Sequence, residues 1–442
     1  MADQESLYGQ QDHTTSPSNY SKENDCYVHR LAIRSNQGGE AYDLTNQLAD
    51  MVICEDMLSP CTRGSLTLVD AVGLATHFPF VGNEVLEVVF ETPMTGRKFE
   101  MEFDVYNLAN ITRNTSDRSE MYDLQFVDRN YMPLINRSIG WALEGTIDSM
   151  VARIVLDAPG AKLGHVDPTD GAKRYIIPHW TAAKTLSWLA ERAVGRGNRL
   201  PGLLLYSDRD GVNLHDVYRA FDTVPVRTYQ KRPNSPVVMH EFENYITNIN
   251  ELKHDVLFDR IRDIDSGVFG SSMLSFDLDT RKLRLKQDVY TNRFRRLKHH
   301  LNHHPVFPNS NRVHENPSAN LAFSADSSFK YGTQFIGNDR SSDWMLERNS
   351  FMADFRSQVL SMKVPGDTRL RLGDVVGVQL TQAGYIDEAK ADPFDRLRSG
   401  NYLVTAIKHA INRTQHTMTV ECSRDSIGKP IPDDIEQGTR EL

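Results

Sequence analysis

The stretch that decides the fold is residues 364–380, which read VPGDTRLRLGDVVGVQL. It is followed by SGNYLVTAIKHAI at 399–411 and by TMTVECSRDS at 417–426. The end of the first segment alternates large apolar with small or polar side chains, and this period of two is typical of a half-buried strand. Pro365-Gly366 and Ser399-Gly400 predict turns, because Pro presets its own φ and Gly tolerates a positive φ. These segments therefore predict a compact set of antiparallel strands.

The order of these segments resembles that of the baseplate hub proteins of contractile-tail bacteriophages. Hub proteins are trimeric rings between the tail tube and the central spike, and they are related in fold to the hub half of the type VI secretion spike. The resemblance extends from about Tyr27 to Asp425. It is carried by Pro365–Asp367, Leu372–Val376, Gly400–His409 and Glu421–Ser426, and upstream by Phe258–Ile261, Gly267–Ser271 and Ser275–Lys282.

The resemblance implies a mainly β fold with two small antiparallel β-barrels, an α/β insertion and a trimeric ring. It divides the chain into a flexible tail at 1–25, a first hub barrel at 26–132 plus 203–236, a helical α/β insert at 133–202, a second hub barrel at 237–290 plus 353–426, a loop-rich insertion at 291–352 and a tail at 427–442.

Residue patterns place individual elements within this division. Five strands are expected in the first barrel, at 27–33, 64–70, 84–90, 99–106 and 121–128. The second barrel is expected to consist of strands at 375–380, 401–411 and 417–422, closing on strands near Ser271–Lys282, because three strands alone are too few to cover a core.

Helical periodicity is concentrated between about residues 133 and 202. Apolar residues recur at helical spacing in 147–155 and again in 182–193, so that each set forms one face of an amphipathic helix. Thr181 is a candidate N-cap of the second helix, and Gly195 a candidate stop. After these helices, Leu203–Ser207 predicts a strand that ends in an Asp-Gly turn.

Length and composition limit the class of protein. The 442 residues are enough for roughly two to four domains. The polar N-terminus lacks an apolar signal segment, and the apolar runs are far shorter than the ~20 residues that span a bilayer. We therefore expect no membrane span and no secretory signal. Cys26, Cys54, Cys61 and Cys422 match no disulfide or zinc framework, which favours reduced thiols in a reducing compartment.

The net charge of -9 argues against a nucleic-acid partner. Binding to nucleic acid depends on Lys and Arg that neutralise phosphates, and this chain has the opposite excess. A local basic group at Arg293–Lys298 is best interpreted as a solvated surface. We expect no specific binding of nucleic acid.

Residues His299, His300, His303 and His304 invite a metal-site interpretation. On a helix they would form two pairs four residues apart, a spacing that can chelate a divalent metal. The segment lacks the Glu of a His-Glu-x-x-His motif, and Pro305 follows at once. The favoured interpretation is a polar loop or interface cluster; metal binding is the alternative.

Two further sets of residues could suggest catalysis. Asp208, Asp210, Asp216 and Asp222 could suggest glycosidase chemistry or a Ca²⁺ loop, but the further ligands of an EF-hand are missing and an Asp-Gly hairpin explains the first two. Ser271-Ser272 lies outside any Gly-x-Ser-x-Gly motif, which argues against a hydrolase triad. We therefore predict no catalytic, cofactor-binding or metal residues, and no enzyme.

The resemblance implies a structural phage protein whose trimer has pseudo-sixfold symmetry. Three chains with two barrels each supply six barrels, so a threefold spike can meet a sixfold tube. The implied partners are further copies of the chain, the tail tube protein, the central spike protein and baseplate wedge or other hub proteins, and the implied location is the virion. A tail-associated cell-wall-degrading enzyme and a peripheral host-binding adhesin remain the alternatives.

Overall fold

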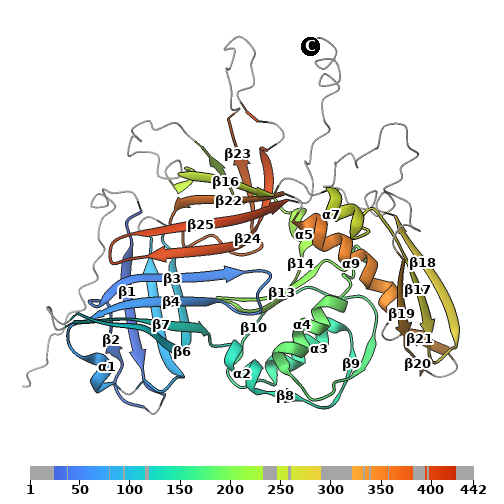
Figure 1. The fold of residues 1–442 in the computed structure, drawn as a ribbon, viewed down its shortest axis with the longest axis horizontal. Coiled ribbons are helices and arrows are strands. Elements are labelled where there is room, and N and C mark those ends of the chain that lie inside the picture. Colours follow the sequence, from blue (N-terminus) through green and yellow to red (C-terminus); the bar gives the residue numbers. More distant parts are fainter. Residues whose placement is uncertain are drawn as a thin grey trace, which may run out of the picture.

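The structure is a computed structural model, and it describes residues 24–36, 38–78, 80–92, 95–114, 119–231, 246–256, 260–289, 321–331, 334–337, 340–356, 358–381, 394–395 and 398–424. Within them the fold is mainly β, and most helical residues lie in two inserts beside the strands (Figure 1). The predicted mainly β fold with antiparallel strands is confirmed. Among the described residues, no helix has the length and apolar character needed to cross a bilayer.

The first barrel is a curled antiparallel sheet in the order β2-β1-β5-β6-β7-β4-β3. Each strand of at least eight residues places one set of side chains in a single apolar core that contains Leu31, Leu66, Phe90 and Phe126. A sheet whose inward faces share one core must curl around it. Its elements are β1 (Tyr27–Arg34), β2 (Tyr42–Asp43), β3 (Leu48–Asp56), β4 (Arg63–Asp70), α1 (Leu74–His77), β5 (Glu84–Glu91), β6 (Lys98–Asn114) and β7 (Ser119–Asp128).

The five strands predicted for this barrel are confirmed, but β3 was not predicted. Its sequence, LADMVICED, is interrupted by Asp50 and by a buried Glu55, so it lacks a clean alternation of apolar residues. β3 is also the strand through which the first barrel pairs with the rest of the sheet.

The helical insert packs two amphipathic helices against short strands. All the apolar positions predicted for 147–155 are buried, and Thr181 caps the second helix by accepting a hydrogen bond from Lys184 N at 3.3 Å. The predicted helices are therefore confirmed. The elements are α2 (Tyr131–Asn136), β8 (Ser138–Ile139), β9 (Ala142–Gly145), α3 (Ile147–Leu156), β10 (Leu163–Val166), β11 (Lys173–Ile176), β12 (Trp180–Thr181) and α4 (Ala182–Arg192).

Residues 203–230 do not complete the first barrel in the way expected. β13 (Leu203–Asp208) and β14 (Gly211–Asp216) form a sheet with β10, and Leu203, Val212 and Leu214 lie in the core of the helical insert. After α5 (Val217–Phe221), β15 (Arg227–Gln230) runs parallel to a strand of the second barrel. The expectation was wrong for these pairings, because the alternation in 203–216 shows that strands form there but not which neighbours they bond.

The second barrel continues the same sheet through β24, β25, β22 and β16, with β23 and β15 on the other side of β24. The three predicted C-terminal strands are confirmed, and their core holds Val376, Val404, Ile407 and Val420. The strands are β16 (Glu251–Val256), β22 (Gln358–Pro365), β23 (Val375–Gln379), β24 (Gly400–Ile411) and β25 (His416–Arg424).

The expected closing partners near Ser271–Lys282 were wrong, because those strands belong to a separate sheet, β18-β17-β19. The region predicted to be loop-rich, 291–352, also holds strands and a long helix within its described part. The elements of this second insert are α7 (Arg260–Asp265), β17 (Gly270–Asp277), β18 (Lys282–Val289), β19 (Leu321–Asp326), β20 (Ser328–Tyr331), β21 (Gln334–Gly337) and α9 (Ser341–Phe355).

Helix α9 was not predicted from the sequence, because it packs against other elements on several sides. Phe351 and Phe355 enter the core of the second barrel, whereas Trp344 lies against Arg192 of the helical insert, whose guanidinium carbon is 4.8 Å from the ring centroid. Arg348 donates to the carbonyl oxygens of Pro201 and Leu203 at 2.9 and 2.6 Å. A helix with contacts in several directions has no single apolar stripe.

Val404→Ala is expected to lower the free energy of unfolding by about 2–3 kcal/mol, through lost burial and the cavity that remains. Val404 is fully buried in β24 between β23 and β25. Chemical denaturation followed by circular dichroism measures the change. Val81→Ala is the matched control, because Val81 is 66% exposed and its truncation should change stability by less than about 0.5 kcal/mol.

Candidate functional site: the junction between the barrels

The two barrels are joined by strand pairing. Residues 51–56 of β3 pair antiparallel with residues 406–411 of β24. The other half of β24, residues 400–403, pairs with β23, and the register of β24 shifts around Thr405. One strand therefore belongs to the second barrel over its first half and bridges to the first barrel over its second half.

A chain of buried polar side chains crosses this junction. The Nε2 atom of His409 lies 3.3 Å from Glu55 Oε2, and its Nδ1 atom lies 3.0 Å from Nε2 of His416. On the far side, Nδ1 of His416 lies 2.9 Å from the hydroxyl of Thr92. Glu55 is 1% exposed, and both histidines are fully buried. Three strands, β3, β24 and β25, and the end of β5 are thereby tied together.

Glu55 is held as a carboxylate. Burial alone would raise its pKa, but the Arg209 guanidinium and the hydrogen bond from His409 outweigh burial, and the pKa of Glu55 lies below its usual value. Burial is the main cause that holds the pKa of His416 well below 6.5, and the neighbouring His409 and Arg209 act in the same direction. With one proton on each ring, the chain of donors is Thr92 to His416, His416 to His409, and His409 to Glu55.

Arg209 reaches the junction from the turn between β13 and β14. Its Nε atom lies 3.5 Å from Glu55 Oε1, and its two terminal nitrogens donate to the carbonyl oxygens of Thr368 and Leu370 at 2.8 and 2.7 Å. The guanidinium also lies over the Phe99 ring, 4.9 Å from its centroid. This one side chain therefore contacts the first barrel, the second barrel and the strand that carries Glu55.

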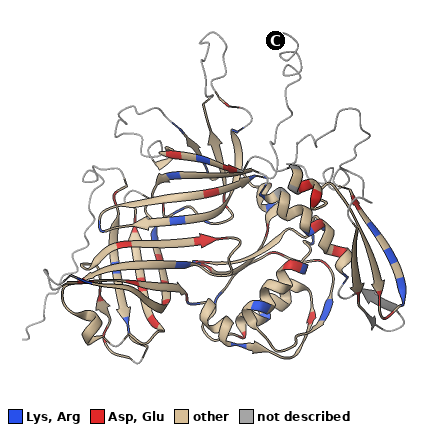
Figure 2. Ribbon diagram, in the orientation of Figure 1, with Lys and Arg blue, Asp and Glu red and all other residues tan. Residues whose placement is uncertain are grey.

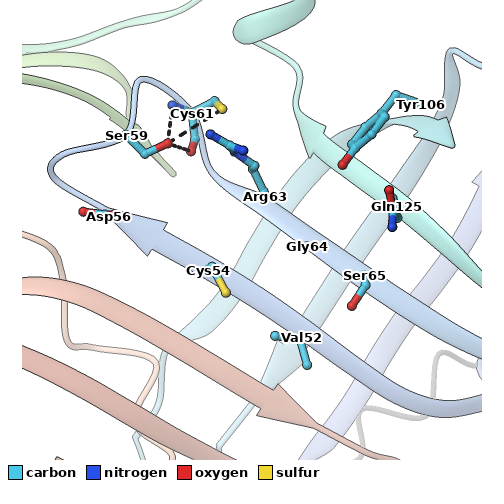
Figure 3. A pocket seen from close by; sticks show the side chains of 10 residues that line it. All are labelled: Val52, Cys54, Asp56, Ser59, Cys61, Arg63, Gly64, Ser65, Tyr106 and Gln125. Carbon is cyan, nitrogen blue, oxygen red and sulfur yellow. Dashed lines mark hydrogen bonds between the residues drawn. The ribbon is translucent and has the colours of Figure 1, made fainter. Parts of the chain in front are cut away.

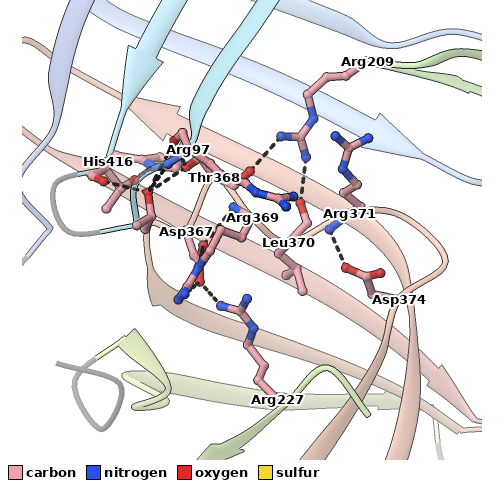
Figure 4. Close-up of polar contacts among 12 residues, drawn as sticks. Arg97, Arg209, Arg227, Asp367, Thr368, Arg369, Leu370, Arg371, Asp374 and His416 are labelled. Atoms are coloured by element: carbon pink, nitrogen blue, oxygen red, sulfur yellow. Dashed lines mark hydrogen bonds and ion pairs between the residues drawn. The ribbon is translucent and has the colours of Figure 1, made fainter. Parts of the chain in front are cut away.

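The segment 365–374 supplies the other side of the junction (Figure 4). Asp367 is fully buried and forms ion pairs with Arg227 and with Arg369, whose Nε lies at 3.1 Å. The next residue, Thr368, lies 3.0 Å from the hydroxyl of Thr95 in the first barrel. The Pro365–Asp367 lead-in that carries the sequence resemblance is therefore a connector between the barrels.

Gly366 is needed for close packing rather than for a positive φ. Its φ is not in the positive range, and a Cβ at this position would overlap the ring of His416. The prediction that Gly366 provides a turn through left-handed backbone is therefore wrong. Gly400, by contrast, has a φ of 146°, as expected for the glycine of Ser399-Gly400.

A second buried polar cluster ties the first barrel to the helical insert. Asp128 accepts from Thr62 N at 2.8 Å and from the Ser207 hydroxyl at 3.1 Å. Asn130 Nδ2 donates to the same hydroxyl at 3.1 Å, while its Oδ1 accepts from Lys162 N at 2.8 Å. Burial, partly offset by these hydrogen bonds, raises the pKa of Asp128 to about 6.

The junction is expected to make stability depend on pH through His416. The unfolded histidine has a pKa near 6.5, so below about pH 6.5 the unfolded chain binds a proton that the folded chain excludes. As the pH falls below 6.5, the free energy of unfolding of the wild type should therefore decrease relative to that of His416→Gln, by up to about 1.4 kcal/mol per pH unit.

Urea unfolding of both proteins between pH 7.5 and 5 measures this difference. Asp128 and Asp216, each with a pKa raised by burial to about 6, act in the opposite direction, because their folded forms bind protons more readily as the pH falls. They are present in both proteins and cancel in the difference. Parallel stability curves for the two proteins would contradict the assignment of His416.

A hollow of about 400 Å³ lies on the outer face of β3, β4, β6 and β7, close to the junction (Figure 3). It is lined mainly by small side chains, among them Cys54, Ser59, Cys61 and Ser65. Both thiols are free, and burial is the main cause that raises the pKa of each. A thiol with a raised pKa is a weaker nucleophile at neutral pH than a thiolate.

The aspartates considered as a chemical cluster have structural roles. Asp208 accepts from Asn213 Nδ2 and from Asp210 N, each at 2.9 Å, and closes the predicted Asp-Gly hairpin. Asp216 caps α5 by accepting from Tyr218 N at 3.1 Å, and Asp222 follows the last turn of that helix. Asp210 forms an ion pair with Arg371.

The remaining chemical candidates are not brought into one site. Ser271 and Ser272 are buried in β17. His299–His304 lies outside the described residues. In the part of the chain that the structure describes, no group of three or more His, Cys, Asp or Glu side chains is arranged to hold a metal ion.

Apart from Pro365–Asp367, which carries the resemblance, the residues of the junction were not given a role from the sequence. His409 stood within a predicted strand, but nothing in its spacing indicated that it would meet Glu55, 354 positions away. A histidine in the middle of an apolar strand was the one available signal, because a buried imidazole requires polar partners.

No protein-family model matches the chain, and no curated protein matches it. Among solved structures, it is similar to a tail protein from Neisseria meningitidis MC58, with a TM-score of 0.52 and 14% identity over 91% of this chain and 98% of that one. A 43 kDa tail protein of prophage MuSo2 from Shewanella oneidensis has a TM-score of 0.49 and 13% sequence identity, over 91% of this chain and 100% of that one. An E. coli component of the type VI secretion system has a TM-score of 0.45 and 10% sequence identity, over 91% of this chain and 79% of that one.

These similarities concern the fold. The chain shares the fold of the Neisseria tail protein over nearly the whole length of both. The resemblance to phage tail proteins that the sequence indicated is thereby confirmed as a similarity of fold.

Proposed function

We propose that this chain is a structural hub protein of a contractile phage baseplate, and that three copies form a ring with pseudo-sixfold symmetry. The ring joins the sixfold tail tube protein to the threefold central spike protein and also contacts wedge or other hub proteins. The protein acts in tail assembly and in penetration of the host envelope. It is made in the host cytoplasm, resides in the virion, and needs no cofactor.

The observation that carries this proposal is the continuous sheet through β3 and β24. A chain that contributes two barrels to a ring must hold them at a fixed relative angle, because any rotation between them would break the pseudo-sixfold spacing. Backbone pairing over 51–56 and 406–411 provides that rigidity. The buried contacts of Glu55, Arg209 and Asp367 reinforce it.

Averaged electron-microscope images of assembled tail tips test the proposal. We expect the protein on the tail axis, between tube and spike, in three copies. Light scattering of the purified protein, alone and with the spike protein, should give a trimer in at least one of the two samples. A peripheral position would favour an adhesin instead, and a monomer in both samples would contradict the ring.

We also propose that the chain has no catalytic role. The polar side chains at the junction hydrogen-bond to one another across strands. Of the aspartates considered as acid or base candidates, Asp208 closes a hairpin and Asp216 caps a helix. Purified protein incubated with purified cell wall should release no soluble fragments. Release of fragments, lost on substitution of a single acidic residue, would favour the enzyme alternative.

A further inference from the structure

The sheet β18-β17-β19 has an inverted pattern of exposure. Basic residues run along β18 (Figure 2), and Lys286 Nζ lies 3.2 Å from Glu347 of helix α9, so these side chains are on the helix side. The alternate residues Leu283 and Leu285 are 65% and 62% exposed. Strands normally turn apolar residues toward the protein and polar residues toward water.

The neighbouring strands extend the same apolar face. In β17, Met273 and Ser275 are buried on the helix side, whereas Phe276 is 43% exposed. The pairing of β17 with β18 and with β19 brings the exposed apolar side chains of these strands next to one another, because residues paired across two strands share a face of the sheet. Phe276 pairs with Leu283, and Leu274 pairs with Leu285 and with Phe323. Leu321 lies two residues before Phe323 in β19 and therefore shares its face.

The result is one contiguous apolar surface, here called the β17–β19 face: Leu274, Phe276, Leu283, Leu285, Leu321 and Phe323. Phe323 is 74% exposed and Leu321 48% exposed. Exposed apolar patches of more than a few hundred Å² are unusual on single chains and mark interaction sites.

A second exposed apolar cluster lies on the first barrel. Val69 of β4 pairs with Met121 of β7, so these two side chains share a face. Ile111 lies in β6 where the pairing with β7 is irregular, between Ala109 and Thr112. Val69, Met121 and Ile111 are 44%, 46% and 59% exposed. Val69, Ile111 and Met121 are here called the β4–β7 rim of the first barrel. The β4–β7 rim and the β17–β19 face lie toward opposite ends of the longest axis of the molecule (Figure 1).

We propose that the β17–β19 face of one copy packs against the β4–β7 rim of the first barrel in the next copy. One chain carries both surfaces, and they lie at opposite ends, so the contact is heterologous and can be repeated from copy to copy until the ring closes. This inference rests on the proposed ring and names the surface that would close it. Its apolar core is suited to another protein surface, since interface cores are depleted of charged residues.

The test is the oligomeric state of the double variant Phe323→Ser, Leu285→Ser. Loss of two central apolar side chains should raise the dissociation constant of the trimer by about 100-fold or more. Light scattering over a range of concentrations, with the spike protein if the trimer requires it, should show the variant as a monomer where the wild type is a trimer. Thermal melting of the monomer should be unchanged, because both side chains are exposed within one chain.

Ile176→Ser is the matched control, since Ile176 is 82% exposed on β11 of the helical insert and belongs to neither surface. It should trimerise like the wild type. A double variant that also trimerises like the wild type would overturn this surface and leave the proposed ring intact. A monomeric wild type under all conditions would instead contradict the ring itself.

Cysteine cross-linking tests the pairing directly. In a Cys54→Ser background, which removes the exposed native thiol, Met121→Cys and Phe323→Cys should form a disulfide between copies. Oxidised samples should then contain covalent dimers and trimers that reductant reverses. Met121→Cys with Ile176→Cys is the control and should give monomers. A trimer in which the first pair does not cross-link would overturn the proposed contact.

Discussion

Replacing Arg209 by Ala is expected to lower the free energy of unfolding by about 3–5 kcal/mol, because it leaves a buried carboxylate without its cation. Glu55 is 1% exposed and lies 3.5 Å from Arg209, and burial alone would raise its pKa. The same change removes the donors to the carbonyl oxygens of Thr368 and Leu370. Urea unfolding followed by circular dichroism measures the loss.

Arg371→Ala is the control for this prediction. Arg371 and Asp210 form an ion pair in which the side chains are 36% and 60% exposed, and an exposed pair contributes only about 0–1 kcal/mol. The double variant Glu55→Gln, Arg209→Met should regain much of the lost stability, since it buries no charge. Equal losses for Arg209→Ala and Arg371→Ala would show that the buried position of the pair has no energetic consequence.

The second large effect is expected for Gly366→Ala, at about 3 kcal/mol or more. The added Cβ would overlap the His416 ring and lie 2.6 Å from the His416 carbonyl oxygen. Neither the His416 ring nor its carbonyl can move freely. The carbonyl accepts a hydrogen bond from Gly366 N at 3.0 Å, and the ring is hydrogen-bonded to both His409 and Thr92. The variant should melt earlier and show the loss in urea unfolding.

Gly197→Ala provides the comparison, because a Cβ there would meet no described atom within 4 Å and Gly197 does not have a positive φ. Its effect should stay within about 0.5 kcal/mol. If Gly366→Ala proves as mild as Gly197→Ala, the strands at the junction are less tightly packed than the structure indicates.

Prediction of individual elements succeeded where the local pattern was sufficient. The spacing of apolar residues in 147–155 predicts both the helix and its buried face, and the apolar run in 401–411 predicts β24. β3 was missed because the polar Glu55 that breaks its pattern is satisfied by Arg209 and His409 from distant parts of the chain. A local rule counts such a residue as evidence against a strand.

The same distinction applies to the junction. The sequence contains Pro365-Gly366-Asp367 and His409, but it does not state that Gly366 packs on His416 or that Asp367 meets Arg227. The first contact depends on the register in which β22 and β25 pair, and the second on the position of β15 beside β23.

The sequence by itself determined the class of fold, the two amphipathic helices of the insert and the three C-terminal strands. Periodicity encodes these features because a side chain's burial follows from its place along one strand or helix. The tertiary structure alone decided that β13 and β14 join the helical insert, that β17–β19 form a separate sheet, and that β3 fuses the barrels. Strand partners are chosen by long-range packing and by the need to satisfy buried charge, and alternation along one strand carries no record of its neighbour.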